Sequence, residues 1–269
     1  HSPGDAAMAP PLSIPLGDIT AARERIRGGI YESPCPGSVP LSLVAGCDVY
    51  CKLDYLQRTG SFKERGARNA LMLLSAAQRK AGVVAASAGN HALGLAYHGQ
   101  LLGIPVTVVM PRTAPLTKVA TCRQLGAQVV LDGEDFRGAY AVARRLVDER
   151  GLSYVHGFDD PHVIAGQGTM GLEIVEQAPD LDAVVVPVGG AGLIAGVALA
   201  VKSLKPGVQV IGVEPKRSAS LTAALAAGGP VDVEVTPTLA DGLAVGRVGE
   251  PAFRSEERRG GQECRSRWS

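Results

Sequence analysis

The order of apolar and polar residues along the chain predicts alternating helices and strands. Four apolar residues recur at helical spacing between Leu16 and Ile30 and predict a first helix: Ile19, Ala22, Ile26 and Ile30. Asp18 or Thr20 is expected to cap it. Short apolar runs predict strands at 49–53, 82–86, 106–110, 128–131, 153–156, 183–188 and 208–213. The segments between them predict helices at 66–74, 91–102, 116–125, 135–149, 163–177, 193–204 and 220–227.

This alternation has the spacing of strand–helix–strand units, which predicts an α/β protein with parallel-rich sheets and right-handed crossovers. Two lobes are the most economical interpretation. Residues 15–75 and 156–253 are expected to form a large lobe, and residues 76–155 a small one.

The segment 254–269, RSEERRGGQECRSRWS, differs from the rest of the chain. It has no apolar periodicity and holds five arginines. It resembles the translation of a sequencing adapter, so we interpret it as a non-native tail and leave it out of the fold prediction. The natural sequence is then expected to break off near Phe253, which leaves the large lobe incomplete.

Composition and charge exclude several classes of function. The 269 residues carry a formal net charge of +1 and no basic run, which argues against nucleic acid or an acidic membrane surface as partner. No apolar run reaches the length of a membrane span, and the first residues lack a signal pattern. A soluble cytoplasmic protein is expected.

The cysteines favour the same compartment. Five of them are scattered without a CxxC pair, at Cys35, Cys47, Cys51, Cys122 and Cys264. Free thiols in a reducing compartment therefore explain them better than a disulfide framework or a zinc site. His156, Asp159 and Asp160 are close in sequence, but nothing fixes them on a common face, so no metal is expected there.

The stretch TGSFKERGA, residues 59–67, holds a lysine between small and aromatic neighbours. Taken alone, Lys63 is either a solvated surface lysine or a nucleophilic amine whose pKa the site lowers. The rest of the chain has to decide between the two.

Two glycine-containing turns offer binding sites. In VPVGGAGLIAG, residues 186–196, an apolar strand leads through glycines into an apolar helix, which suits a small phosphorylated ligand or is simply a tight turn. The loop lacks the lysine of a Walker motif, so a nucleoside triphosphate is not expected. In SAGNH, residues 87–91, polar groups at a helix start either bind a carboxylate or a ring hydroxyl, or cap the helix through Ser87 or Asn90.

GQGT, residues 166–169, is interpreted as a third turn in which helix capping by Thr169 is favoured over ligand contact. An amine, a phosphate cradle and a carboxylate site together indicate pyridoxal 5′-phosphate acting on an amino acid.

Seven motifs carry a resemblance to a known family: TGSFKERGARNAL, SAGNHALGLAYHG, IPVTVVMPRTAPLTK, IAGQGTMGLEI, VPVGGAGLIAGVA, GVEP and TLADGLAVGRVG. In this order they resemble the threonine (serine) dehydratases, which are fold-type II pyridoxal-phosphate enzymes. The resemblance spans residues 19–253. It implies the two-lobe α/β fold similar to that of the tryptophan synthase β subunit.

The resemblance implies a role for each matching residue. Lys63 would hold the cofactor as a Schiff base with Phe62 against its ring, and Asn90 would bind the ring hydroxyl. Ser87, Asn90 and His91 would receive the substrate carboxylate. The phosphate would lie in a cradle of backbone amides from Gly189, Gly190, Ala191, Gly192 and Leu193. Most relatives have four glycines there, and Ala191 is expected to be tolerated unless it needs a positive φ.

The implied reaction is β-elimination from threonine or serine, which gives 2-oxobutanoate or pyruvate and ammonia. The full-length protein would be a homo-oligomer. Serine racemase, 3-hydroxyaspartate dehydratase, a β-replacement synthase and a non-catalytic truncated fragment remain alternatives. The family's residue facing the pyridine nitrogen is expected beyond Phe253.

Two departures from the family pattern narrow these alternatives. Ala88 stands where serine racemases place a second serine, and an alanine cannot transfer a proton, so elimination is favoured over racemisation. Glu214 matches a cation ligand of some relatives, but Ser218 and Ser220 stand where an acidic partner is expected. No metal is therefore predicted at this position.

Overall fold

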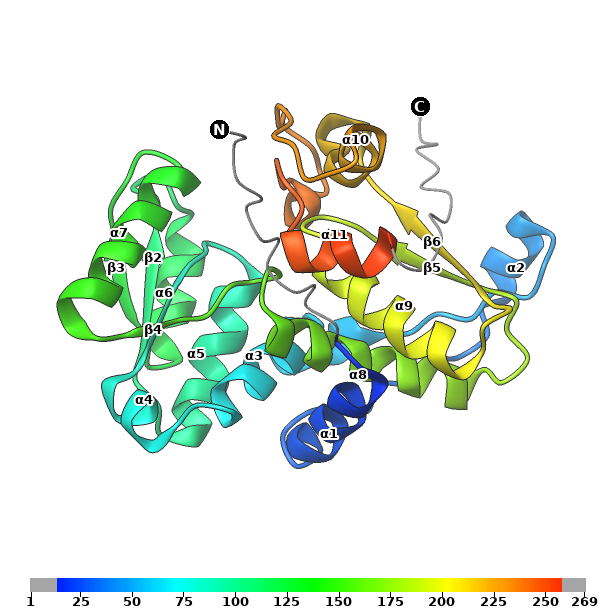
Figure 1. Ribbon diagram of the computed structural model, residues 1–269, viewed down its shortest axis with the longest axis horizontal. Helices are drawn as coiled ribbons and strands as arrows, with labels where there is room; N and C mark the ends of the chain where they lie inside the picture. The colour runs from blue at the N-terminus through cyan, green and yellow to red at the C-terminus, as the bar shows by residue number, and fades with distance from the viewer. Residues whose placement is uncertain (1–13, 258–269) are drawn as a thin grey trace, which may run out of the picture.

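The computed structural model describes residues 14–257 and consists of two parallel sheets with their helices (Figure 1). The strands are β1 (Val83–Ala86), β2 (Val106–Met110), β3 (Gln128–Leu131), β4 (Ser153–Tyr154), β5 (Ala183–Pro187) and β6 (Gln209–Val213). The helices are α1 (Leu16–Ile26), α2 (Val39–Ala45), α3 (Lys63–Met72), α4 (Ala76–Ala81), α5 (Asn90–Leu102), α6 (Leu116–Gln124), α7 (Phe136–Arg150), α8 (Pro161–Gln177), α9 (Gly192–Leu204), α10 (Ser220–Ala227) and α11 (Glu250–Glu257). Short 3₁₀ turns lie at η1 (Asp54–Leu56), η2 (Lys216–Ser218) and η3 (Asp241–Leu243).

All pairings between these strands are parallel, as the sequence pattern predicts. The first sheet has the order β3-β2-β1-β4, with Val83 opposite Val106 and Thr107 opposite Gln128. The second sheet pairs β5 with β6, with Ala183 opposite Gln209. Parallel strands are joined by crossover helices, and these helices bury the faces of the sheets.

Successive residues of β1 point to opposite faces of the four-stranded sheet, and helices cover both of these faces. Val83 and Ala85 pack into a core with α5 and α6. Val84 and Ala86 pack into a second core with α7. Every residue of β1 and β2 is buried, which explains why their sequences read as continuous apolar runs.

The two-stranded sheet belongs to a separate core formed by α1, α8, α9, α10 and α11. In β5, Val184 and Val186 are buried in this core, while Val185 is 64% exposed. Because each sheet has its own core, we propose the division into a small lobe at 76–155 and a large lobe at 15–75 and 156–253 as the domain organisation.

Glycines allow the central helices to cross at close range. A Cβ on Gly166 of α8 would lie 2.6 Å from the Cα of Gly66 in α3. A Cβ on Gly196 of α9 would lie 2.6 Å from the backbone nitrogen of Gly168 in α8. The stretch GQGT is therefore the interior of a packed helix, and our interpretation of it as a turn is wrong.

Other sequence-based boundaries also need correction. The predicted strand 49–53 is no regular strand: its one assigned bridge joins Tyr50 to Gly37. The N–H groups of Cys51 and Leu53 donate to Pro36 and Pro34, and the prolines have no N–H to donate in return. In the other direction the Ser38 N–H donates to the Val49 carbonyl oxygen at 2.7 Å, and a ladder interrupted by two prolines does not form a regular strand.

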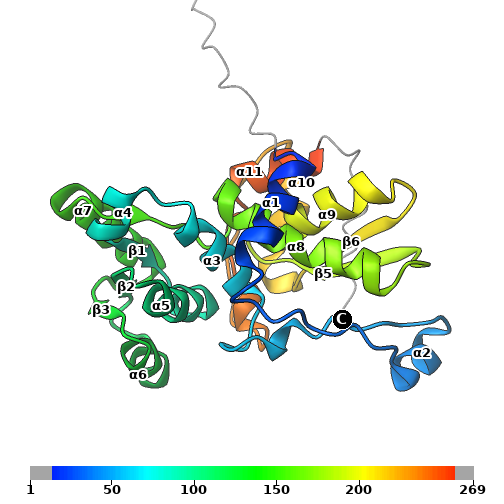
Figure 2. The same cartoon turned by 90° about the horizontal axis from the view of Figure 1, so that it is seen from below.

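The first helix ends at Ile26 rather than Ile30 and has no side-chain cap, since Pro15 precedes it. The Thr20 hydroxyl donates instead to the Gly17 carbonyl oxygen at 2.9 Å. The pattern did not predict α2, α4 or α11, and α2 lies apart from the other helices in both views (Figure 2).

Helix α11 extends to Glu257 and so enters the segment interpreted as a non-native tail. The rest of that segment, with Cys264, lies outside the described residues. The four described cysteines are free thiols. In the part of the chain from 14 to 257, no helix has the length and apolar character needed to cross a membrane.

Candidate active site

Lys63 is the first residue of α3, three residues before the predicted start of that helix. Its Nζ donates a hydrogen bond of 2.6 Å to the carbonyl oxygen of Gly157. The same atom lies 5.3 Å from the ring centre of Phe62 and 5.9 Å from that of Phe158. The amine is thus held between two aromatic rings and one backbone carbonyl.

These surroundings change the acidity of the amine. The Lys63 residue is partly exposed, but its Nζ is enclosed by protein atoms, and desolvation lowers its pKa to about 8. A solvated surface lysine has a pKa near 10.5. Close to neutral pH, a sizeable fraction of Lys63 is therefore an unprotonated, nucleophilic amine.

The glycine loop 188–192 joins the end of β5 to the start of α9, where first-turn N–H groups lack helical partners. Ala191 precedes the helix with a φ of 68° and is the only non-glycine residue of positive φ within the described range. Ala191 therefore has the positive φ under which the sequence analysis did not expect an alanine to be tolerated. It adopts the left-handed conformation that favours glycine.

Phe158 packs directly on this loop. A Cβ on Gly190 would lie 2.3 Å from the Phe158 Cγ, and one on Gly192 would lie 2.8 Å from the Phe158 carbonyl oxygen. Since the same ring flanks Lys63, Phe158 connects the lysine with the glycine loop.

The turn SAGNH leads from β1 into α5 with Gly89 as the N-cap residue. No side chain caps this helix, so the alternative in which Ser87 or Asn90 serves as its cap is wrong. The Ser87 Oγ accepts a hydrogen bond of 3.2 Å from the Gly89 backbone, and Asn90 is exposed as the first helical residue. The helix start is therefore open to a ligand.

His91 is buried beside this turn. Its Nε2 lies 3.0 Å from the Val155 carbonyl oxygen, which can only accept, so Nε2 carries the proton. Burial, followed by the charge of Lys63, lowers the His91 pKa to about 3. The ring is neutral, and its Nδ1 is a buried acceptor without a partner among the described residues. Only the backbone N–H of His91 can donate to a carboxylate.

The sequence analysis gave no role at this site to Gly157 and Phe158, and it considered His156 only as a metal ligand. The His156 Nδ1 accepts a hydrogen bond of 2.9 Å from the Asp159 backbone, and burial lowers the His156 pKa to about 4. These residues follow β4, which pairs in parallel with β1. Carboxyl ends of parallel strands meet at one edge of a sheet, and this signal was available from the sequence.

A buried pair connects the lysine helix with the helix that begins at Asn90. The His98 Nε2 on α5 lies 3.0 Å from the Glu64 Oε2 on α3, and neither side chain is exposed. The Glu64 Oε1 also accepts from the Thr59 backbone in the loop before Lys63. A Cβ on Gly94 would lie 3.3 Å from the Glu64 nitrogen, so the two helices pack closely here.

The residues considered for a metal have other roles. Glu214 accepts hydrogen bonds from the backbone of Leu221 at 2.7 Å and of Thr222 at 2.9 Å, at the start of α10. The Ser218 hydroxyl donates to the Leu243 carbonyl oxygen at 3.2 Å. Asp160 caps α8 by accepting from the His162 backbone at 2.7 Å. Between residues 14 and 257 we find no metal-binding group of three such side chains.

The donor set fits pyridoxal phosphate. Lys63 offers an amine that can lose its proton, and the loop at 188–192 offers backbone N–H groups at a helix start for a phosphate. The buried, unpartnered Nδ1 of His91 lies beside them. Phe62 and Phe158 offer apolar surface to a flat ring.

Comparison with known proteins agrees with this fit. The family model described as "Pyridoxal-phosphate dependent enzyme" matches residues 26–265. The chain is 52% identical over 240 residues to the L-threonine ammonia-lyase of Thermotoga maritima, a match covering 89% of this chain and 60% of that relative. It is 44% identical over 242 residues to the catabolic L-threonine dehydratase TdcB of Escherichia coli K12, covering 90% of this chain and 74% of that relative.

Solved structures show the same fold. The processed form of threonine deaminase isoform 2 from Solanum lycopersicum superposes with a TM-score of 0.86 at 45% identity, covering 90% of this chain and 70% of that one. Maize serine racemase superposes with a TM-score of 0.88 at 33% identity, covering 93% and 75%. By sequence and fold, this chain belongs to the family of pyridoxal-phosphate dependent enzymes.

Proposed function

We propose that this chain carries the active site of a pyridoxal-phosphate-dependent ammonia-lyase. Its reaction is β-elimination from L-threonine or L-serine, which gives 2-oxobutanoate or pyruvate and ammonia. The observation that carries the proposal is the enclosed amine of Lys63, with a pKa of about 8, beside the glycine loop. The names of the relatives in Thermotoga maritima and Escherichia coli support threonine as substrate.

The chain's own groups divide the work. Pyridoxal phosphate, when bound, supplies a carbonyl group that reacts with amines and an electron sink for charge on the substrate α-carbon. Lys63 would hold it, and the Lys63 Nζ would take the α-proton of the substrate. Five residues hold the phosphate through backbone N–H groups at the start of α9: Gly189, Gly190, Ala191, Gly192 and Leu193.

The substrate carboxylate binds at the start of α5. The Ser87 Oγ accepts from the Gly89 backbone, so its own hydroxyl proton is free to point to a ligand. The backbone N–H groups of Asn90 and His91 belong to the first turn of the helix, where no helical acceptor exists for them. The Asn90 side chain is the donor proposed for the cofactor ring hydroxyl.

Serine racemisation is the second candidate, because two serine racemase structures share this fold at 33% and 34% identity. Racemisation needs an acid on the face of the substrate opposite Lys63. The residue at the position proposed for that acid is Ala88, whose methyl group cannot donate a proton. Elimination is therefore favoured over racemisation, and 3-hydroxyaspartate stays an alternative substrate for elimination.

The test is a visible absorbance spectrum of the purified chain with pyridoxal phosphate, before and after threonine, beside Lys63→Ala. We expect a band that requires Lys63 and changes with threonine. Release of 2-oxo acid from threonine, serine and 3-hydroxyaspartate then ranks the substrates. No release from any of the three, in protein that binds the cofactor, would rule out the lyase assignment.

Location and assembly are further parts of the proposal. The free thiols of Cys35, Cys47 and Cys51 suit the reducing cytoplasm. A homo-oligomer is supported by α2, which has no buried residue, and by Leu43 and Val44 on it, which are 81% and 88% exposed. Subunit contacts typically cover apolar surface of this kind. Light scattering during size-exclusion chromatography measures the assembly directly.

A further inference from the structure

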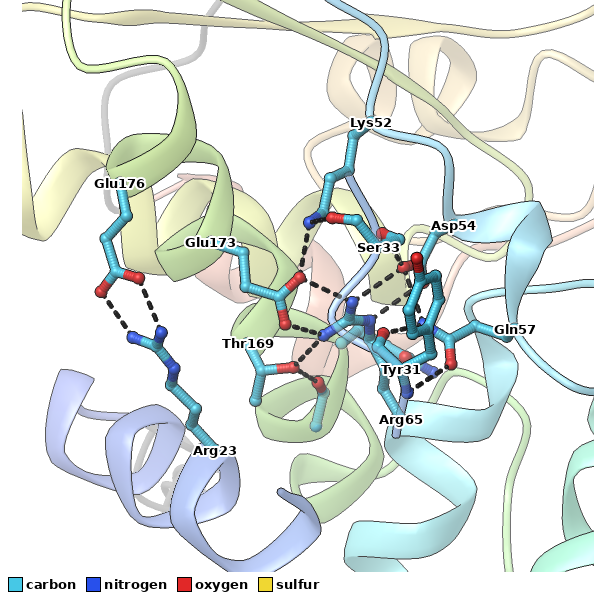
Figure 3. Close-up of polar contacts among 12 residues, drawn as sticks. Arg23, Tyr31, Ser33, Lys52, Asp54, Gln57, Arg65, Thr169, Glu173 and Glu176 are labelled. Carbon is cyan, nitrogen blue, oxygen red and sulfur yellow. Dashed lines mark hydrogen bonds and ion pairs between the residues drawn. The ribbon is translucent and has the colours of Figure 1, made fainter. Parts of the chain in front are cut away.

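Arg65 stands two residues after Lys63, in the first turn of α3, and is fully buried. All five of its N–H groups donate hydrogen bonds to neighbouring side chains (Figure 3). Toward Asp54, Nε donates at 2.9 Å and Nη2 at 2.8 Å. Toward Glu173, Nη1 donates at 2.6 Å and Nη2 at 2.8 Å, and Nη1 also donates to the Thr169 hydroxyl at 3.0 Å.

The two carboxylates are held in turn by further groups. Asp54 accepts from the Ser33 hydroxyl at 2.7 Å and from the Gln57 side chain at 3.0 Å. Glu173 pairs with the Lys52 Nζ at 2.5 Å. The buried cluster therefore holds two positive and two negative charges. Each charge has an oppositely charged partner, as buried ions in low-dielectric surroundings require.

This cluster joins three parts of the fold. Thr169 and Glu173 belong to α8, Asp54 is the first residue of η1, and Lys52 lies just before it. Arg65 is the member that comes from α3. Its planar fork binds carboxylates on two sides, so it fixes the rotation of the helix as well as its position.

The first turn of α3 depends on contacts with other segments to stay in place. Phe62 precedes the helix, and no side chain caps it. The Arg65 N–H donates to the Phe62 carbonyl oxygen at 3.1 Å and the Gly66 N–H to the Gln167 Oε1 at 3.2 Å, but a helix end without a side-chain cap is prone to fraying. Lys63 is the first residue of this turn, so any rotation of the turn moves its amine away from Gly157.

We propose that Arg65 is a positioning residue for Lys63. Its guanidinium fork fixes the first turn of α3 against α8 and η1, and so holds the Lys63 amine against the Gly157 carbonyl oxygen between two aromatic rings. The importance of this orientation for elimination rests on the proposed function. The orientation itself does not, because the contacts involve the chain alone.

The titration of Lys63 in the chain without cofactor tests this inference. The protein is labelled with a trace of an amine-acylating reagent over a series of pH values, and the Lys63 peptide is quantified by mass spectrometry. In Arg65→Lys, which keeps the charge but loses the fork, we expect the midpoint to rise by about one pH unit toward that of an ordinary lysine.

Arg23→Lys is the matched control. Arg23 forms a bidentate pair with Glu176, also on α8, at 2.5 Å and 2.6 Å, but this pair does not include α3. The Lys63 midpoint should stay unchanged in this variant. A folded Arg65→Lys protein with the wild-type midpoint would overturn the proposal.

Circular dichroism shows whether Arg65→Lys folds. If it does not, Asp54→Asn decides, because it weakens one side of the fork and keeps the shape of the side chain. A smaller rise of the midpoint supports the proposal, and no rise overturns it. Missing 2-oxo acid release by the wild-type chain counts against the lyase function only, since the labelling uses neither cofactor nor substrate.

Discussion

The carbonyl oxygen of Gly157 accepts the hydrogen bond of the Lys63 Nζ at 2.6 Å, so the turn after β4 holds the amine of α3. The same glycine touches α5, because a Cβ on Gly157 would lie 3.3 Å from the Cγ of His91. Three segments far apart in sequence thus meet at one residue without a side chain. The acidity of Lys63 follows from this enclosure, and it can be measured.

We expect the reaction of Lys63 with pyridoxal phosphate to speed up as pH rises through about 8. Desolvation lowers the pKa of the amine to about 8, and only the neutral amine attacks a carbonyl. Stopped-flow absorbance at a series of pH values measures the rate. A midpoint near 10.5, the ordinary value of lysine, would show that the amine is not enclosed as described.

The lowered pKa of Lys63 also makes the free energy of unfolding depend on pH. Between pH 8 and 10.5 the unfolded chain binds the Lys63 proton and the folded chain does not, so this residue makes the free energy of unfolding rise with pH there. Below pH 8 its burial costs at most about 3 kcal/mol. Lys63→Met should therefore be more stable than wild type near pH 7 in urea unfolding, with a difference that shrinks as pH rises from about 8 to about 10.5.

Ala191→Gly should stabilise the protein by about 0.5–1 kcal/mol. The φ of Ala191 is 68°, which costs an alanine about 1–2 kcal/mol, and the greater freedom of glycine in the unfolded chain offsets part of the gain. Thermal unfolding measures the change. Ala195→Gly, inside α9, is the matched control and should destabilise by about 1 kcal/mol. Destabilisation by Ala191→Gly would contradict a strained backbone at this residue.

The sequence predicted the strands better than the site. β2 and β3 have the predicted bounds, because short apolar runs between turn residues leave little choice. The start of α3 was placed too late because Glu64 and Arg65 look solvent-exposed in a hydropathy pattern. Both are buried against polar or charged side chains far along the chain, which no local pattern reveals.

Whether the sequence analysis found the other residues of the site depended on how clearly each residue type signals its role. Lys63 and the glycine loop were found because their residue types carry the chemistry. Phe158 was missed because its place after β4, at the carboxyl edge of a parallel sheet, was its only signal, and an aromatic residue there forms no motif. The glycines of GQGT were misinterpreted because glycine serves close helix crossing as well as turns, and only the packing partner tells the two apart.

The contact of Phe158 with the glycine loop gives a fourth prediction. Gly190→Ala should destabilise the loop and weaken cofactor binding, because the new Cβ would lie 2.3 Å from the Phe158 ring. Fluorescence titration with pyridoxal phosphate and thermal unfolding measure the two effects. Phe158→Ala in the same chain should restore part of the loss by opening the space that the methyl group needs.

Gly207→Ala provides the matched control, since a Cβ at Gly207 would have no atom within 4 Å and its φ is not positive. It should change neither the cofactor affinity nor the stability by more than about 0.5 kcal/mol. An equally harmless Gly190→Ala would mean that the Phe158 ring moves freely away from the loop.

Arg65→Met should lower the free energy of unfolding by about 3–5 kcal/mol, because it leaves the buried carboxylates of Asp54 and Glu173 with Lys52 as their remaining cation. Arg23→Met should cost only about 0–1 kcal/mol, since its pair with Glu176 is 25% and 52% exposed. Urea unfolding of both variants compares the two sites.

The pH dependence of this difference separates lost charge pairing from lost packing. Burial alone would raise the Asp54 pKa, but the hydrogen bonds and charge of Arg65 outweigh it and hold that pKa below its usual value. Without Arg65, burial raises the Asp54 pKa, and protonation then relieves the unpaired charge. The stability gap between wild type and Arg65→Met should therefore narrow as pH falls from about 7 toward about 4. A gap that stays constant over this range would mean that Arg65 stabilises the fold by packing rather than by charge.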